Sequence, residues 1–292
     1  MNWWVYYRFF IKETIHGSVL NSLPFFGSYG GILSNHYEIQ KNIIELLNDF
    51  NKENELLSSV IIANPFNSND ETYNKIYKYD IKEERLIQCI NLKNKSQDIL
   101  WNEFEQRVRR SIRKSEKNLV SVSTEDVNDQ RFEKFYQLHK TDMELKNGRP
   151  KPTEFFKYVR KHFVQRQDYD MFTAIKDNEE IAYLLVFYFP PFTEYYMPAY
   201  RSDYKHLQST SLLIWESIKE SIKRNMEFYN FGGTWKNQNE LYMFKKGWNS
   251  TDYHYNYYIF RDLSRINAIG LKSVKENYEN FYVTSYEEIV KK

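Results

Sequence analysis

The spacing of apolar side chains predicts alternating helices and strands in the first half of the chain. Helical spacing is clearest in two segments, 37–54 and 97–117. In the second segment, apolar residues recur every four positions and share one face: Leu100, Phe104, Val108 and Ile112. Apolar or alternating runs predict strands at 6–10, 20–26, 57–63, 75–79, 86–92 and 119–123. This alternation is typical of an α/β layer fold.

The second half of the chain repeats the alternation. Helices are expected at 129–145, 154–163, 210–224, 239–246 and 263–278. Strands are expected at 170–176, 180–189, 194–201, 228–231 and 251–260. The longest apolar run, 181–189, is about half as long as a membrane span requires, so we expect no membrane-spanning segment.

Composition narrows the class of protein only slightly. Hydrophobic residues make up 41% of the chain, which indicates a folded globular protein, and the net charge of +2 neither favours nor excludes a nucleic-acid partner. The single cysteine, Cys89, lies in an apolar run and is expected to be a buried structural thiol. Residues 1–10 lack the features of a signal peptide, so a cytoplasmic location is expected.

Several common catalytic motifs are absent from the sequence. It contains no GxGxxG, GxxxxGK[ST], GxSxG or HExxH pattern. Dinucleotide, P-loop, α/β-hydrolase and zinc chemistry therefore have no support, and no metal site is expected.

Three segments contain candidate binding residues. The turn Tyr29-Gly30-Gly31 lets a substrate approach the backbone closely, or is simply a turn after a strand. The helix 107–117 carries six basic residues that would attract phosphates, although charged helix faces are often merely solvated. The segment His206–Ser211 precedes a helix whose first amides could bind an anion, or acts as an ordinary cap.

Four segments, in their order and spacing, resemble the FemAB-like aminoacyltransferases. They are Leu23–Leu33, Phe104–Lys117, Tyr136–Pro152, and Tyr229–Gly233 followed by Leu241–Trp248. The resemblance implies an α/β (α+β) fold of two tandem GNAT-like domains, with mixed, mostly antiparallel central sheets flanked by helices. The expected domains are 1–122, joined by the C-terminal segment 263–292, and 123–262.

The resemblance also implies roles for individual residues. Phe244 and Lys245 are the expected catalytic pair, in which the lysine offsets negative charge on a tetrahedral intermediate. The implied substrate-binding residues are Tyr29, Gly30, Gly31, Arg109, Arg113, Arg149, Tyr200, Asn230 and Gly232. The implied donor-binding residues are Ser209, Thr210 and Ser211. Candidates for a general base rest on family-like placement alone: Asp142, Glu144, Tyr200 and Asp203.

The function implied is transfer of an aminoacyl group from aminoacyl-tRNA, or of another acyl group, onto a primary amine of a cell-envelope precursor. Two alternatives stay open: acyl-CoA-dependent acetylation of an amino sugar of a surface polysaccharide, and a non-catalytic binding protein. The loop before Thr210 has no glycine, which favours the tRNA donor, and the Phe244-Lys245 pair argues against a non-catalytic role.

The expected partners follow from this function. They are tRNA and a lipid-linked or nucleotide-linked acceptor, with no bound cofactor and a location in the cytoplasm at the inner face of the membrane. Monomer and homodimer both stay open.

Overall fold

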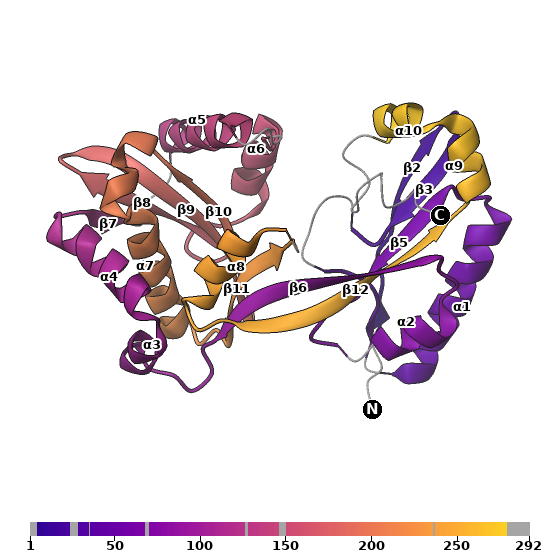
Figure 1. Cartoon of the computed structure of the whole chain (residues 1–292), viewed down its shortest axis with the longest axis horizontal. Coiled ribbons are helices and arrows are strands. Elements are labelled where there is room, and N and C mark those ends of the chain that lie inside the picture. Colours follow the sequence, from indigo (N-terminus) through magenta and orange to yellow (C-terminus); the bar gives the residue numbers. More distant parts are fainter. Residues whose placement is uncertain are drawn as a thin grey trace. The chain divides into compact units, whose positions relative to one another are not determined.

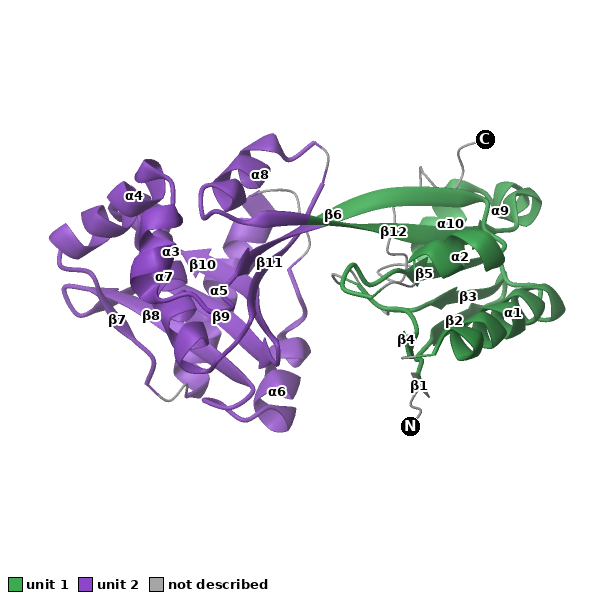
Figure 2. Ribbon diagram, turned by 90° about the horizontal axis from the view of Figure 1, so that it is seen from below, with its two compact units in different colours: residues 1–86, 253–292 green, residues 87–252 purple. Residues whose placement is uncertain are grey.

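The computed structural model describes residues 5–23, 29–34, 36–67, 70–125, 128–145, 150–235 and 237–278. The chain divides into two compact units, residues 1–86 with 253–292 (unit 1) and residues 87–252 (unit 2), which Figure 2 shows in different colours. Strands β6 (Ile81–Asn91) and β12 (Thr251–Arg261) contain the two points at which the chain passes between the units.

Unit 1 is a sheet with helices on both faces (Figure 1). Strands β2 (Phe10–Thr14), β3 (Gly17–Asn21) and β5 (Ser58–Ile62) belong to this sheet. Strands β1 (Val5–Tyr6) and β4 (Leu33–Ser34) pair with each other in a separate two-stranded sheet. Its helices are α1 (Tyr37–Glu53), α2 (Asp70–Ile76), α9 (Leu263–Ile269) and α10 (Leu271–Asn277). Successive residues of a strand face opposite sides, so Leu20 packs with α1 and α2 while Val19 packs with α9 and α10.

In unit 2 the strand order is β6-β11-β10-β9-β8-β7. The strands are β7 (Ser121–Ser123), β8 (Tyr169–Lys176), β9 (Glu179–Phe189), β10 (Phe192–Tyr200) and β11 (Phe228–Thr234). Strands β7 to β10 pair antiparallel, whereas β10 and β11 pair in parallel. The expected mixed, mostly antiparallel α/β sheet is thus confirmed.

Helices also cover both faces of the sheet in unit 2. They are α3 (Gln97–Glu103), α4 (Gln106–Lys117), α5 (Asp129–Leu145), α6 (Thr153–His162), the 3₁₀ helix η1 (Ser202–Leu207), α7 (Ser209–Lys223) and α8 (Asn239–Lys246). On β9, Leu184 and Val186 pack with α3, α4 and α7, while Tyr183 and Leu185 pack with α5 and α6. No helix in the described part of the chain is long and apolar enough to span a bilayer.

The prediction of a strand at 75–79 is wrong. Residues Asp70–Ile76 form helix α2, and the next residue, Tyr77, still donates its backbone amide to the carbonyl oxygen of Tyr73 at 3.0 Å. Tyr73 and Tyr77 lie four positions apart and are both buried. The two tyrosines therefore follow the helical period. The alternation of lysine and tyrosine in residues 75–79 resembles a strand pattern and hides that period in the sequence.

Two predicted helices are each divided into two. The helix expected at 97–117 breaks at Phe104, whose ring packs against Trp215 and Trp248 in the core. The helix expected at 263–278 breaks at Gly270, which has a positive φ of +84°. The apolar period continues through both breaks, so periodicity alone does not reveal them.

The unit boundaries differ from those expected at 122/123 and 262/263. Val108 and Ile112 share one buried cluster with Leu212 and Trp215, so residues 87–122 belong to the core of unit 2. Tyr258 instead packs in the core of unit 1. The boundaries therefore fall within the two long strands, where the sequence has no linker composition to indicate them.

Candidate functional site

The candidate site lies where β10 and β11 stop pairing. Their parallel register covers only residues 192–194 and 228–230, although the strands continue to Tyr200 and Thr234. A bulge between Tyr195 and Met197 also interrupts the pairing of β10 with β9. The carboxyl ends of parallel strands are a common position for ligands in α/β sheets.

Glu194 is the last residue of β10 that pairs with β11. One of its carboxylate oxygens accepts a hydrogen bond of 2.8 Å from the amide nitrogen of Asn230, which is fully buried. Burial raises the pKa of Glu194 to about 7, and the hydrogen bond from Asn230 opposes this rise. Among the residues that the structure describes, no cation lies within ion-pair distance of Glu194. A carboxylate with this pKa can accept a proton near neutral pH.

Asn230 connects Glu194 to the backbone of β11. The side-chain oxygen of Asn230 accepts a hydrogen bond of 2.8 Å from the backbone amide of Gly232. Gly232 has a φ of +72°, a conformation that a residue with a side chain adopts only with strain. Its carbonyl oxygen accepts a hydrogen bond of 3.0 Å from the ammonium group of Lys245. A continuous set of hydrogen bonds therefore joins Glu194 to Lys245.

Lys245 projects from α8 into the interior of unit 2. Its side-chain nitrogen also donates to the carbonyl oxygen of Gly233 at 2.8 Å and to the hydroxyl of Thr234 at 2.9 Å. The residue is 2% exposed, and burial lowers its pKa to about 8. In the described ranges no carboxylate pairs with it. A buried cation held only by neutral oxygens is unfavourable for stability and is typical of functional sites.

The neighbouring residues on α8 have different surroundings. Lys246 lies 3.5 Å from a carboxylate oxygen of Asp252 and donates to the carbonyl oxygen of Ser250 at 2.9 Å. Phe244 is partly buried, and its ring meets that of Trp248 edge-on at 6.5 Å. The structure thus distinguishes the two adjacent lysines, because only Lys245 reaches the network.

A family model described as an acetyltransferase (GNAT) domain matches residues 102–246, which all lie in unit 2. No curated protein matches the chain. Among solved structures, FemX superposes with a TM-score of 0.66 at 13% identity, covering 87% of this chain and 88% of that one.

Two further solved structures superpose over most of their length. The C-terminal domain of a lysylphosphatidylglycerol synthetase from Agrobacterium fabrum gives a TM-score of 0.60 at 9% identity, covering 91% and 85% of the two chains. L-PGS from Bacillus licheniformis also gives a TM-score of 0.60 at 9% identity, covering 94% and 86%. The chain has a FemAB-like fold. The GNAT acetyltransferase domain matched over residues 102–246 makes the protein an acyltransferase.

The structure brings together three of the residues predicted for the FemAB-like site. Asn230, Gly232 and Lys245 are joined by hydrogen bonds. Glu194, which the sequence analysis missed, completes the set. Its sequence neighbours, Thr193 and Tyr195, form an ordinary strand pattern, and only the pairing of β10 with β11 places the carboxylate beside Asn230. The signal available in the sequence was a glutamate, Glu194, on a face of a predicted strand that is otherwise apolar.

Cys89 is buried, as predicted. Burial raises the pKa of its thiol well above its usual value, and the negative charge of Glu194 raises it further, while Lys245 lowers it. The thiol therefore lies within electrostatic reach of both charged residues and stays protonated. It fills space in the network and has no properties of a nucleophile.

Arg109 and Arg113 occupy different positions on α4. The guanidinium group of Arg109 donates to the carbonyl oxygens of Trp101 at 3.2 Å and Asn102 at 3.1 Å, and also to that of Phe104. It therefore caps the end of α3. Arg113 is exposed and lies 5.3 Å from the ring centre of Trp101.

The predicted donor-binding residues open helix α7. Ser209 and Ser211 are 3% and 7% exposed, so their side chains point into the protein. Thr210 is half-buried between them. A donor at this position would meet the backbone of the first turn of α7 rather than these two serine hydroxyls.

Tyr29, Gly30 and Gly31 belong to unit 1, whereas the network lies in unit 2. Gly31 has a φ of +89°, and a side chain there would clash with the hydroxyl of Tyr73. The missing side chain thus makes room for Tyr73, which accepts a hydrogen bond of 2.7 Å from the amide of Ile32.

The other predicted residues are not part of the network. Arg149 lies outside the described residues. Tyr200 ends β10 and packs against the apolar core. Of the base candidates, Asp203 is paired with Arg201 at 2.7 Å, which lowers its pKa, and Glu144 is exposed near Lys140.

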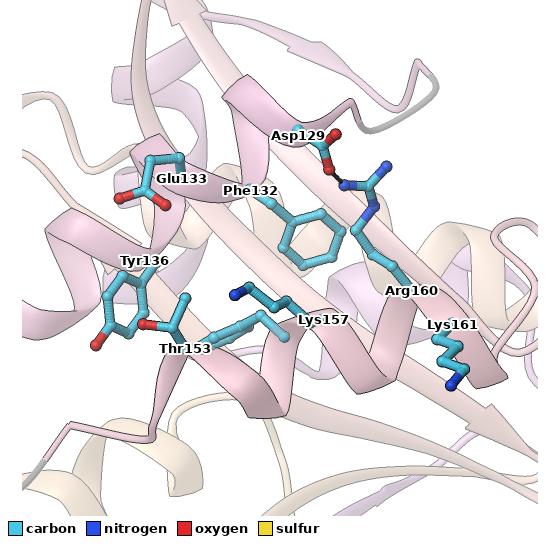
Figure 3. Close-up of a pocket in the computed structure, with 9 residues that line it drawn as sticks. Asp129, Phe132, Glu133, Tyr136, Thr153, Lys157, Arg160 and Lys161 are labelled. Atoms are coloured by element: carbon cyan, nitrogen blue, oxygen red, sulfur yellow. Dashed lines mark ion pairs between the residues drawn. The ribbon is translucent and has the colours of Figure 1, made fainter.

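A separate hollow of about 510 Å³ lies between α5 and α6 (Figure 3). Helix α6 contributes Lys157, Arg160 and Lys161, and α5 contributes the carboxylates of Asp129 and Glu133. Arg160 pairs with Asp129 and lies over the ring of Phe132. Basic and acidic side chains thus face the same hollow, and it carries little unbalanced charge.

Proposed function

We propose that the FemAB-like protein transfers an aminoacyl group from tRNA to a primary amine of a cell-envelope precursor. The observation that carries the proposal is the buried set of hydrogen bonds from Glu194 through Asn230 and Gly232 to Lys245. It combines a carboxylate of pKa about 7 with a cation at the end of the parallel strands.

The reaction requires a deprotonated amine. A free alkylamine has a pKa of about 10.4, so only a small fraction is neutral at pH 7. In our proposal the Glu194 carboxylate accepts the proton as the amine nitrogen bonds to the carbonyl carbon of the donor. The ester bond to the 3′ oxygen of tRNA then breaks, and that oxygen takes the proton from Glu194.

Lys245 contributes mainly as a fixed positive charge. Its three protons are donated to Gly232, Gly233 and Thr234, so it holds the end of β11 in place. Negative charge on the tetrahedral intermediate is stabilised by this ammonium group across a short distance in a partly dry site. The Lys245 ammonium can donate a hydrogen bond to the intermediate only if it gives up one of these three hydrogen bonds.

Two observations favour a tRNA donor. The described loop before α7 has no glycine, so it lacks the glycine-rich composition with which a helix N-terminus usually holds the phosphates of coenzyme A. One of the structural neighbours, the A. fabrum protein, is named as a lysylphosphatidylglycerol synthetase. Transfer of lysyl groups is the chemistry that this name describes.

The second candidate is acyl-CoA-dependent transfer to an amino sugar. The GNAT acetyltransferase match and the early end of β10–β11 pairing favour it. A panel of donors distinguishes the two: lysyl-, alanyl-, glycyl- and seryl-tRNA against acetyl-, succinyl- and palmitoyl-CoA, each with peptide-amine and amino-sugar acceptors. Mass spectrometry of the acceptors should show transfer from a charged tRNA. Transfer from a coenzyme A thioester alone would contradict the proposal.

A further inference from the structure

Helix α4 carries five basic side chains on one exposed face. Arg107, Arg110, Lys114 and Lys117 follow one another at intervals of three or four residues, and Arg113 lies beside them. We call these five residues the α4 basic stripe. All five are exposed, whereas Val108, Ile112 and Ser115 on the opposite face are buried. With a rise of about 1.5 Å per residue, the stripe is about 15 Å long.

The positive charge of the stripe is largely unbalanced. Arg107 pairs with Glu105 at 2.7 Å, but within the described ranges no carboxylate forms an ion pair with the other four. The α5–α6 hollow has three cations and also contains the carboxylates of Asp129 and Glu133. Charge alone therefore favours an anionic partner on α4 more strongly than on α6.

The stripe is anchored at both ends to elements of the candidate site. At its start, Arg107 donates to the carbonyl oxygen of Met243 on α8, the helix that carries Lys245. Near its end, the hydroxyl of Ser115 donates to the carbonyl oxygen of Leu207 at 2.6 Å, just before α7 begins. Figure 1 shows α4 beside α3 and α7 in the same unit. Helix α4 therefore contacts both α8 and the segment that precedes α7, two elements of the candidate site.

We propose that the α4 basic stripe binds the phosphate backbone of the donor RNA. The inference rests on the proposed function, which requires a tRNA whose 3′ end enters the site. Five cations over about 15 Å match a chain of regularly spaced phosphates better than a single diphosphate. Three of the five residues of the stripe are arginines. Arginine suits phosphate recognition because its guanidinium group donates hydrogen bonds in a fixed, forked geometry. Trp101 beside Arg113 adds an aromatic surface at the edge of the stripe.

The test is binding of fluorescently labelled, uncharged bulk tRNA, measured by anisotropy from 50 to 300 mM salt. The double variant Arg110→Glu/Lys114→Glu removes the centre of the stripe, and Lys157→Glu/Lys161→Glu makes the same charge change on α6. We expect about tenfold or greater loss of affinity for the α4 variant only. We also expect its plot of log K against log salt to be less steep by about 1.5, since each phosphate contact contributes about 0.7 to 0.9.

A second arm separates this inference from the proposed function. Both variants are assayed for transfer from an aminoacylated adenosine, a small donor that lacks the RNA stem and should be used equally well by all forms. Equal loss of tRNA affinity in both variants, or no loss in the α4 variant, would contradict the proposal that the α4 basic stripe binds RNA. Binding of phosphatidylglycerol vesicles, but not of tRNA, through α4 also overturns it. If tRNA binding depends on α4 but no donor supports transfer, the proposed function is wrong, whereas RNA binding by the α4 basic stripe is confirmed.

Discussion

The β10–β11 network and the α4 basic stripe both contain cationic side chains, but in opposite environments. Lys245 is 2% exposed, is held by three neutral oxygens and has a pKa near 8. The cations of the α4 basic stripe are exposed to water. Buried charge is strong at short range and suited to chemistry, whereas exposed charge acts over longer distances and weakens with salt.

This difference between buried and exposed charge indicates how each region would act on a donor. The stripe would attract and orient a polyanion without changing its reactivity. The network would act on the few atoms at which bonds form and break. Substitutions in the two regions should therefore affect different measured quantities, affinity for the donor in one case and turnover in the other.

The largest effect is expected from Glu194→Gln. The amide keeps the size of the side chain but cannot accept the proton of the amine, so kcat should fall about 10²- to 10⁴-fold. Binding of tRNA should stay unchanged, as measured by anisotropy. A variant that keeps more than half of the wild-type kcat would remove Glu194 from the mechanism.

The next effect is expected from Lys245→Ala, with Lys246→Ala as its matched control. Loss of the buried ammonium should lower kcat about 10²- to 10³-fold, because a preorganised positive charge is lost. Lys246 belongs to a partly exposed ion pair and should matter little. Steady-state kinetics of the two variants checks this, and equal effects would show that α8 matters only for packing.

Stability should also depend on Glu194 in a pH-dependent way. Its folded-state pKa of about 7 lies above the ordinary value of 4.5, so the folded protein binds more protons between these values. The contribution of Glu194 to stability is full below pH 4.5 and is lost as the pH rises through 7. Between pH 4.5 and pH 8, the free energy of unfolding of Glu194→Gln should therefore rise relative to that of the wild type by about 1–3 kcal/mol. Urea unfolding at both pH values measures the gain, and a pH-independent difference would contradict the raised pKa.

The smallest effect concerns Arg109, which lies on the stripe's helix but caps α3. Arg109→Ala should lower the free energy of unfolding by about 1–3 kcal/mol, because three carbonyl oxygens lose their donor. It should leave the salt dependence of tRNA binding unchanged, unlike Arg110→Ala. A change in that salt dependence would show that Arg109 contacts the ligand after all.

The sequence predicted the stripe better than it predicted the network. Six basic residues in 107–117 are visible without a structure, and only the separation of Arg109 from the others required coordinates. The helices at 37–53, 129–145 and 239–246 were likewise predicted closely, because their apolar period is regular. The breaks at Phe104 and Gly270 were not, because that period continues through them.

The network depends on contacts between residues far apart in the chain. Glu194 and Asn230 are 36 positions apart, and only the parallel register of β10 with β11 makes them neighbours. The raised pKa of Glu194 results from burial, which local sequence does not encode. The resemblance to FemAB-like proteins implied Lys245 and Asn230, but its candidates for a general base, Asp142, Glu144, Tyr200 and Asp203, did not include Glu194.

The pH dependence of kcat/KM for transfer to an amine tests the central claim most directly. The rate should rise as Glu194 loses its proton near pH 7 and fall above about pH 8 as Lys245 loses its charge, once the titration of the acceptor amine has been measured and subtracted. In Glu194→Gln the acidic limb should disappear from the residual rate. An acidic limb that is the same in the wild type and in Glu194→Gln would contradict the account.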